Sequence, residues 1–148
     1  MRINYVLTSV IINKSHQIKK SAIITDESCF YAESGGQVGD KGIISTENAE
    51  FKVTDTRKTP QGIFIHFGNL ISGNFKIGDE VKLKIDTSLR DLIKKNHSAT
   101  HLLHAALRNN LGLHVAQRGS LVNENKLRFD FSHNKQISSN KKISNYHR

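Results

Sequence analysis

The stretch from Asp86 to Leu111 holds 26 residues without glycine or proline, and Gly112 follows directly. Because glycine and proline are the residues that most disfavour a helix interior, a run of this length predicts one long helix. Asp86, Thr87 or Ser88 can cap its N-terminus, and Gly112 is placed to cap its C-terminus. Any fold of this chain must therefore be built around a helix that separates an upstream part from a downstream part.

The upstream part, residues 1–86, consists of short β-forming runs separated by turn residues. Val81, Leu83 and Ile85 alternate with lysines, which is the period of a half-buried strand. Several such strands in a row predict a small antiparallel β-barrel or sandwich. The expected strands are Asn4–Ile12, Ser21–Thr25, Gly42–Ser45, Glu50–Asp55, Gly62–Phe67 and Glu80–Ile85.

The downstream part predicts a β-hairpin with strands Leu113–Val122 and Lys126–Phe131, joined by a polar turn. Residues 135–148 contain no acidic residue and few aliphatic ones, so a disordered tail is expected there. The predicted fold class is α+β. Its expected domains are a β-barrel at 1–86, a helix and hairpin at 87–134, and the tail at 135–148.

The charge of the chain favours a polyanionic partner. With 22 Lys+Arg against 13 Asp+Glu the formal net charge is +9, which suits nucleic acid, although the basic residues are scattered and a merely solvated basic surface remains an alternative. No apolar run approaches the roughly 18 residues that a spanning helix needs. No signal-peptide cleavage site follows the N-terminal apolar stretch. One cysteine excludes an intrachain disulfide, so we expect a reducing, cytoplasmic location without a membrane.

Three histidines, His97, His101 and His104, lie within eight residues of the predicted helix and within about 60° of one another around its axis. At i and i+4, His97 and His101 can reach one tetrahedral metal ion, while two solvated histidines are the alternative. His104 is expected not to be a ligand. The apolar residues are expected to form a core face on the opposite side, namely Leu92, Ala99, Leu102, Leu103, Ala106 and Leu107.

A zinc site needs three protein ligands when catalytic and four when structural. The remaining candidates in the chain are Cys29, His114, His133 and His147. Cys29 stands in an apolar stretch and is expected to be a small buried side chain. No further cysteine–histidine cluster is present in the sequence.

The segment Phe30–Gly42 is rich in glycine but matches neither a Walker loop nor a dinucleotide-binding fingerprint. Gly35 and Gly36 can let backbone amides approach a ligand closely, and the amide of Gln37 can both donate and accept hydrogen bonds. A tight turn between two strands is the alternative interpretation.

Two segments, FYAESGGQVGDKG and NHSATHLLHAALRNNLGLHVAQRGSLVNENKLRFDFSH, together closely resemble the editing region of the alanyl-tRNA synthetase family, and the wording FYAESGGQ resembles that family more than the related free-standing editing proteins. The resemblance covers about residues 1–134. It implies a barrel like those of translation factors, followed by the start of an α+β editing domain. It also implies hydrolysis of the ester of serine or glycine wrongly attached to tRNA(Ala), with the acceptor end of that tRNA as the partner.

The resemblance also implies roles for individual residues. His97 and His101 match the family's two helical zinc ligands, and Gln37 matches the glutamine of a loop that lines the editing pocket, where it would be catalytic. The expected substrate-binding residues are Gly35, Gly36, Gln117, Arg118 and Ser120.

The family completes its zinc site with a downstream Cys-x-x-x-His that these 148 residues lack. We therefore expect weak metal binding and weak or no activity from this chain alone, because the other ligands supply much of the binding free energy. A separate chain carrying the rest of the synthetase is one expected partner. The alternative function is a non-catalytic, basic RNA-binding remnant.

Overall fold

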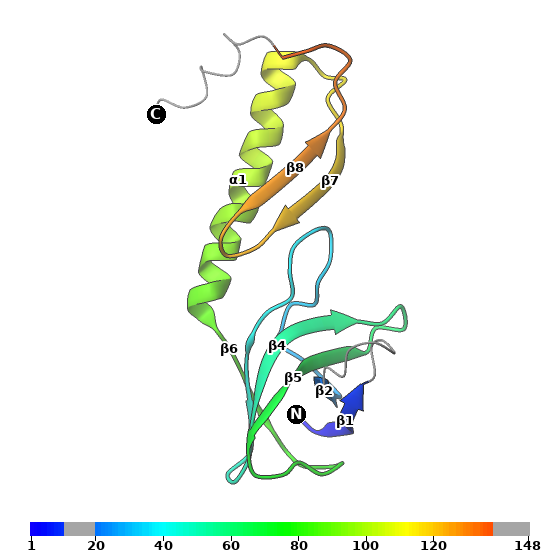
Figure 1. The fold of residues 1–148 in the computed structure, drawn as a ribbon, viewed down its shortest axis with the longest axis vertical. Coiled ribbons are helices and arrows are strands. Elements are labelled where there is room, and N and C mark those ends of the chain that lie inside the picture. The colour runs from blue at the N-terminus through cyan, green and yellow to red at the C-terminus, as the bar shows by residue number, and fades with distance from the viewer. Residues whose placement is uncertain (11–19, 138–148) are drawn as a thin grey trace.

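A computed structural model describes residues 1–10 and 20–137 of the chain. The fold is α+β: a curled antiparallel sheet is followed by one long helix and a separate two-stranded sheet, as the sequence predicts (Figure 1). Residues 138–148 of the tail predicted at 135–148 lie outside the described residues, as does the predicted strand end at Ile11–Ile12.

The larger sheet contains six strands in the order β1-β2-β5-β4-β3-β6, and all neighbours are antiparallel. The strands are β1 (Ile3–Val10), β2 (Lys20–Thr25), β3 (Gly42–Ser45), β4 (Glu50–Lys58), β5 (Phe64–Ser72) and β6 (Lys82–Ile85). A bridge between Arg2 and Glu80 connects the start of β1 to the residues before β6, so the sheet curls until its two edges meet. This arrangement is the small barrel that the sequence predicts.

The interior of the curled sheet is filled by one apolar cluster, Ile3, Ile23, Phe30, Ile44, Phe51, Val53 and Val81. Five of the seven, Ile3, Ile23, Ile44, Phe51 and Val53, come from the strands, in which successive side chains point to opposite faces. On β4, Phe51 and Val53 are buried while the intervening Lys52 is exposed. Alternation thus fixes which side of each strand faces solvent.

The observed strands differ from the predicted ones mainly at their ends. β4 continues to Lys58 and β5 to Ser72, because the two pair along their whole length and so extend into the predicted turns. At the edge of the sheet, β6 begins at Lys82, whereas the sequence predicted that this strand begins at Glu80.

The helix α1 spans Thr87–Leu111, as predicted. Asp86 caps its N-terminus, with the carboxylate accepting a hydrogen bond from the Leu89 amide at 3.0 Å. Gly112 caps its C-terminus at φ +115°, and its amide donates to the Arg108 carbonyl. No helix in the described part of the chain is long and apolar enough to cross a membrane.

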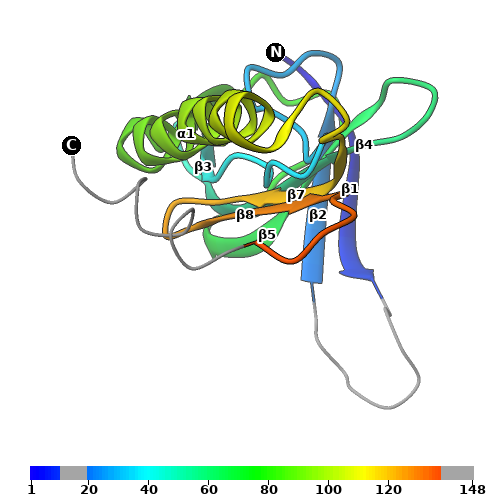
Figure 2. The ribbon, with the colours of Figure 1, turned by 90° about the horizontal axis from the view of Figure 1, so that it is seen from above.

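The second sheet is a hairpin of β7 (Gln117–Val122) and β8 (Leu127–Phe131), and α1 packs against it (Figures 1 and 2). Residues 113–116, expected to begin the first strand, instead form the connection from the helix. The Asn96 side chain donates to the Asn123 carbonyl at 2.8 Å, which fixes the helix to the hairpin turn.

The predicted apolar face of α1 is wrong in part. Leu92 and Leu102 are 45% and 72% exposed, whereas Ile93 and Thr100 are the buried helix residues. The Asn96 side chain binds the hairpin turn, and the buried Thr100 hydroxyl donates to the Asn96 carbonyl at 2.8 Å, so polar side chains occupy part of the packed face. Hydrophobicity alone therefore misplaced this face.

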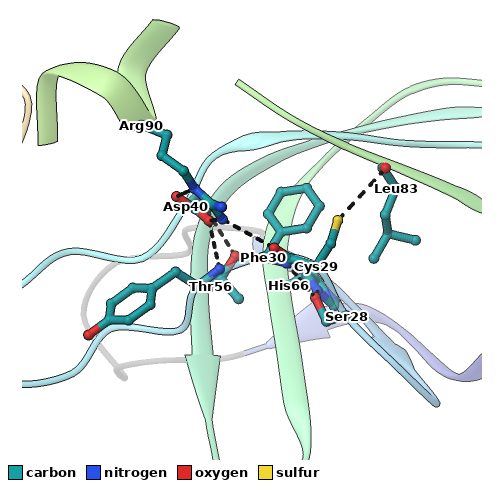
Figure 3. Close-up of polar contacts among 9 residues, drawn as sticks. Ser28, Cys29, Phe30, Asp40, Thr56, His66, Leu83 and Arg90 are labelled. Carbon is teal, nitrogen blue, oxygen red and sulfur yellow. Dashed lines mark hydrogen bonds and ion pairs between the residues drawn. The ribbon is translucent and has the colours of Figure 1, made fainter. Parts of the chain in front are cut away.

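The barrel also contains a buried polar group, His66 on β5, with 0% of its surface exposed. Its Nδ1–H donates to the Ile23 carbonyl at 3.1 Å, so Nε2 accepts from the Ser28 hydroxyl at 2.8 Å (Figure 3). The Ser28 oxygen in turn accepts from the Phe30 amide at 3.0 Å. Burial lowers the pKa of His66, because the interior disfavours the imidazolium.

This buried histidine predicts acid sensitivity of the fold. Unfolded His66 has an ordinary pKa of about 6.5, so below that pH the unfolded chain binds the proton more readily than the folded chain. The free energy of unfolding should be highest above about pH 6.5 and should fall as the pH drops towards the lower folded-state pKa. His66→Gln should flatten this dependence in urea titrations. A slope unchanged from wild type would contradict the assignment, and His114→Gln, at an exposed histidine, is the control.

Candidate functional site

The glycine-rich loop between β2 and β3 docks onto β7 of the hairpin. Gln37 forms a parallel bridge with Val122, the Val38 amide donates to the Val122 carbonyl at 3.0 Å, and the Val122 amide donates to the Gly36 carbonyl at 2.8 Å. The loop thus lies along the edge of β7 and pairs with it through this one bridge. We call this contact, residues 35–38 against Ser120–Val122, the seam.

Gly36 makes the seam possible. An added Cβ at this position would lie 2.3 Å from the Ser120 carbonyl oxygen, and φ is +85°, a region that residues with side chains rarely adopt. Gly35 also has a positive φ, +58°, but a Cβ there would meet nothing within 4 Å. The two adjacent glycines therefore differ: close approach requires Gly36, and backbone conformation alone favours glycine at position 35.

Side chains at the seam form a short hydrogen-bonded chain. The Ser120 hydroxyl donates to the Gly35 carbonyl at 3.0 Å, 85 positions away in the sequence, and the Gln117 amide donates to Ser120 Oγ at 3.2 Å. The Gln37 side chain is half-buried and has no hydrogen-bond partner among the described residues. Its amide is therefore available to a ligand as both donor and acceptor.

The structure brings five of the six predicted substrate-site residues together at the seam: Gly35, Gly36, Gln37, Gln117 and Ser120. Arg118 is exposed on the same strand and has no ion-pair partner in the described part of the chain.

Two ion pairs join the barrel to the helix and the hairpin. Arg90 on α1 binds both carboxylate oxygens of buried Asp40 and also donates to the Cys29 carbonyl at 3.1 Å (Figure 3). The hydrogen bond to Asp40 raises the pKa of Arg90. Lys41 pairs with Glu124 at 2.8 Å, and this hydrogen bond lowers the pKa of Glu124. Sequence reasoning missed these pairs, because only the folded chain brings their partners close.

His97 and His101 lie next to each other on the exposed surface of α1. Their Nε2 atoms are 3.0 Å apart and their ring centroids 4.8 Å apart. Two nitrogens bound to one tetrahedral Zn²⁺ at the usual distance stand about 3.3 Å apart, so this pair fits two of the four positions. No group of three or more His, Cys, Asp or Glu side chains placed to hold a metal occurs within residues 1–10 and 20–137.

The remaining ligand candidates lie elsewhere. The ring of His104 contacts Phe129 on β8, with ring centroids 5.0 Å apart. His114 and His133 pair with each other at 2.9 Å. Cys29 is exposed, with its sulfur 3.8 Å from the Leu83 carbonyl, so the expectation that it is buried is wrong. The buried apolar position in this stretch is occupied instead by its neighbour Phe30, which is 2% exposed. His147 lies outside the described residues.

Comparison with known proteins identifies the protein family to which this chain belongs. Residues 4–89 match the family model described as tRNA synthetases class II (A), and the chain belongs to that family. Within it, the chain is similar to alanine–tRNA ligases. It is 56% identical over 119 residues to that of Parvibaculum lavamentivorans, and 52% identical over 118 residues to that of Mesorhizobium japonicum.

The ligase of Rhodopseudomonas palustris is 52% identical over 120 residues. These matches cover 80 to 81% of this chain but only 13 to 14% of the relatives. The chain thus corresponds to a segment of an alanyl-tRNA synthetase.

The role of Gly36 in the seam can be tested with a matched pair of variants at Gly35 and Gly36. Gly36→Ala should detach the loop from β7, because its Cβ meets the backbone of Ser120, whereas Gly35→Ala should cost only about 1 kcal/mol for its left-handed conformation. Amide hydrogen exchange at Val122 and Val38 measures this directly. Fast exchange in Gly36→Ala with slow exchange in Gly35→Ala is expected. Equal protection in both variants would contradict a role for Gly36 in close approach.

Proposed function

We propose that this segment contributes the editing site of an alanyl-tRNA synthetase and hydrolyses the ester of serine or glycine attached to tRNA(Ala) in the cytoplasm. The observation that carries the proposal is the seam, which brings Gln37 close to Gln117 and Ser120 from a distant part of the sequence. The side-chain amide of Gln37 has no hydrogen-bond partner there among the described residues. The similarity to alanine–tRNA ligases supports the substrate.

Alanine selection creates a need for such a site. A pocket that fits alanine cannot strongly reject glycine, which is smaller, or serine, which adds one hydroxyl to the same methyl group. A second site that destroys the wrong products corrects these errors. Editing a serine ester then requires polar groups that recognise its hydroxyl.

The residues at the seam can supply that recognition. The amide nitrogen of Gln37 can donate to the ester carbonyl, and its oxygen can accept from the serine hydroxyl. Gln117 and Ser120 hold each other and the Gly35 carbonyl, so they keep the loop at a fixed distance from β7. The role we assign to Gln37 is thus to orient the ester for attack by water.

The pair of His97 and His101 on α1 supports a role for a metal ion in the proposed function. Zn²⁺ held by His97 and His101 would supply positive charge to position the mischarged 3′ end. The 3.0 Å separation of the two nitrogens fits two ligand positions, and the proposal assigns the others to donors beyond the described residues or to a separate chain.

A non-catalytic RNA-binding role is the second candidate, and the net charge of +9 favours it. Such a protein would bind tRNA in a salt-dependent manner without cleaving any ester. Single-turnover deacylation separates the two candidates, because binding alone leaves the ester intact.

Deacylation of Ser-tRNA(Ala) by excess protein, with and without added zinc, tests the proposal. The ester should be cleaved faster than in buffer, and Gln37→Ala should lower the single-turnover rate by about tenfold to a thousandfold, the range for loss of an orienting polar group. Glu33→Ala, an exposed residue in the same loop, should retain the rate. No cleavage by stoichiometric wild-type protein would remove the proposed activity from this chain.

Metal binding by the histidine pair is tested separately. Zinc titration of the wild type should show one weak site per chain, and His97→Ala or His101→Ala should abolish it because one imidazole alone holds the ion poorly. His114→Ala, which breaks the other histidine pair, should bind zinc as the wild type does. If His97→Ala kept the zinc site and His114→Ala lost it, the metal would bind to the pair of His114 and His133 and the proposal would be wrong.

A further inference from the structure

A second surface of the barrel lies where β3, β4 and β6 meet the start of α1. A groove of about 530 Å³ opens here, and its lining includes Lys41, Lys52, Lys84, Ile43, Val53 and Leu89. Figure 1 shows β6 leading directly into α1. The volume is in the range of small-molecule and nucleotide sites.

The strand register places two lysines in one row across the groove. Ile43 on β3 pairs with Lys52 on β4 on one side and with Lys84 on β6 on the other. Two interstrand spacings separate the two lysines, about 9.5 Å between their backbones. Lys52 also pairs with Asn69 on β5, so this row contains no acidic residue.

Lys52 and Lys84 are exposed and have no ion-pair partner within the described residues. Lys41 is already paired with Glu124. The acid in the groove lining is Asp86, whose carboxylate caps α1. The adjacent row differs, because there Lys82 pairs with Ser45 and Ser45 pairs with Glu50. Neither lysine faces an acid across the strands of its own row, and two like charges do not stabilise each other, so an external anion can pair with both.

The other large hollow of the barrel provides a contrast. Its volume is about 930 Å³, and its lining combines Lys76 and Lys82 with three acids, Glu47, Asp79 and Glu80. The smaller groove thus has three lysines against one acid in its lining, whereas the larger hollow has two lysines against three acids.

We propose that this groove binds the sugar–phosphate backbone of RNA, with Lys52 and Lys84 contacting phosphates and Ile43 lying beneath the intervening nucleotide. The alternation of charge, apolar residue and charge matches a nucleotide, in which an apolar sugar or base face lies between two phosphates. An acidic peptide would use the lysines but would gain little from the apolar floor. The inference deepens the proposed function, because both assume RNA as the ligand.

Fluorescence anisotropy with a short labelled single-stranded RNA and with uncharged tRNA, at several salt concentrations, tests the groove. Lys52→Gln/Lys84→Gln should weaken binding several-fold and reduce the slope of log K against log salt by about 1.4, since each single-strand phosphate contact contributes about 0.7. Lys76→Gln/Lys82→Gln removes the same charge from the acid-containing hollow and should change neither quantity appreciably.

Three results would overturn the inference. Equal weakening by both double variants would show that only total charge matters, and unchanged binding by Lys52→Gln/Lys84→Gln would remove the site. Competition by a polyglutamate peptide as strong as by unlabelled RNA would show that the groove recognises charge without the nucleotide. Because the probes carry no amino-acid ester, loss of deacylation with intact RNA binding would fault the proposed function alone.

Discussion

The main-chain bonding between the glycine loop and β7 is the constraint on which the candidate site depends. Two hydrogen bonds, from Val38 to Val122 and from Val122 to Gly36, align a barrel loop with a hairpin that follows it by more than eighty positions. Because main-chain bonds of a sheet fix both register and distance, the loop cannot slide along β7 without losing them. This alignment therefore positions every side chain to which we assign a role in recognising the ester.

The alignment also requires that the helix and barrel keep a fixed relation, and the buried carboxylate of Asp40 provides it. Asp40 accepts from the Tyr31 amide at 2.6 Å, while Arg90 binds its two oxygens from the first turns of α1. Removing Arg90 would destabilise the fold, because the Asp40 carboxylate, with 4% of its side chain exposed, would stay buried without compensation. The pair thus acts at the base of the helix, as the Lys41–Glu124 pair does near the hairpin turn. Together they limit rotation of the hairpin about the seam.

The sequence predicted the elements well because their signals are local. The helix follows from the absence of glycine and proline over 26 residues, and its caps follow from Asp86 and Gly112. The packed face of the helix was predicted less well, since Thr100 is buried while Leu102 is exposed, and this depends on where the hairpin lies. The adjacent histidines follow from helical spacing alone. The ion pair of Asp40 with Arg90 joins positions 50 apart, so no local pattern indicates it.

The seam and the lysine groove can divide the work of recognition because they act over different ranges. Hydrogen bonds at the seam act only within about 3 Å and depend strongly on angle, whereas lysine charge acts over roughly the 8 Å Debye length of physiological salt. In the proposed function, the ligand is a large polyanion, but the difference to be detected is one hydroxyl or one methyl group. If affinity for the tRNA comes from Lys52 and Lys84, the residues around Gln37 need not hold the tRNA tightly. Their geometry can then distinguish the attached amino acids, since contacts shared by every tRNA add the same free energy to each and leave the difference between them unchanged.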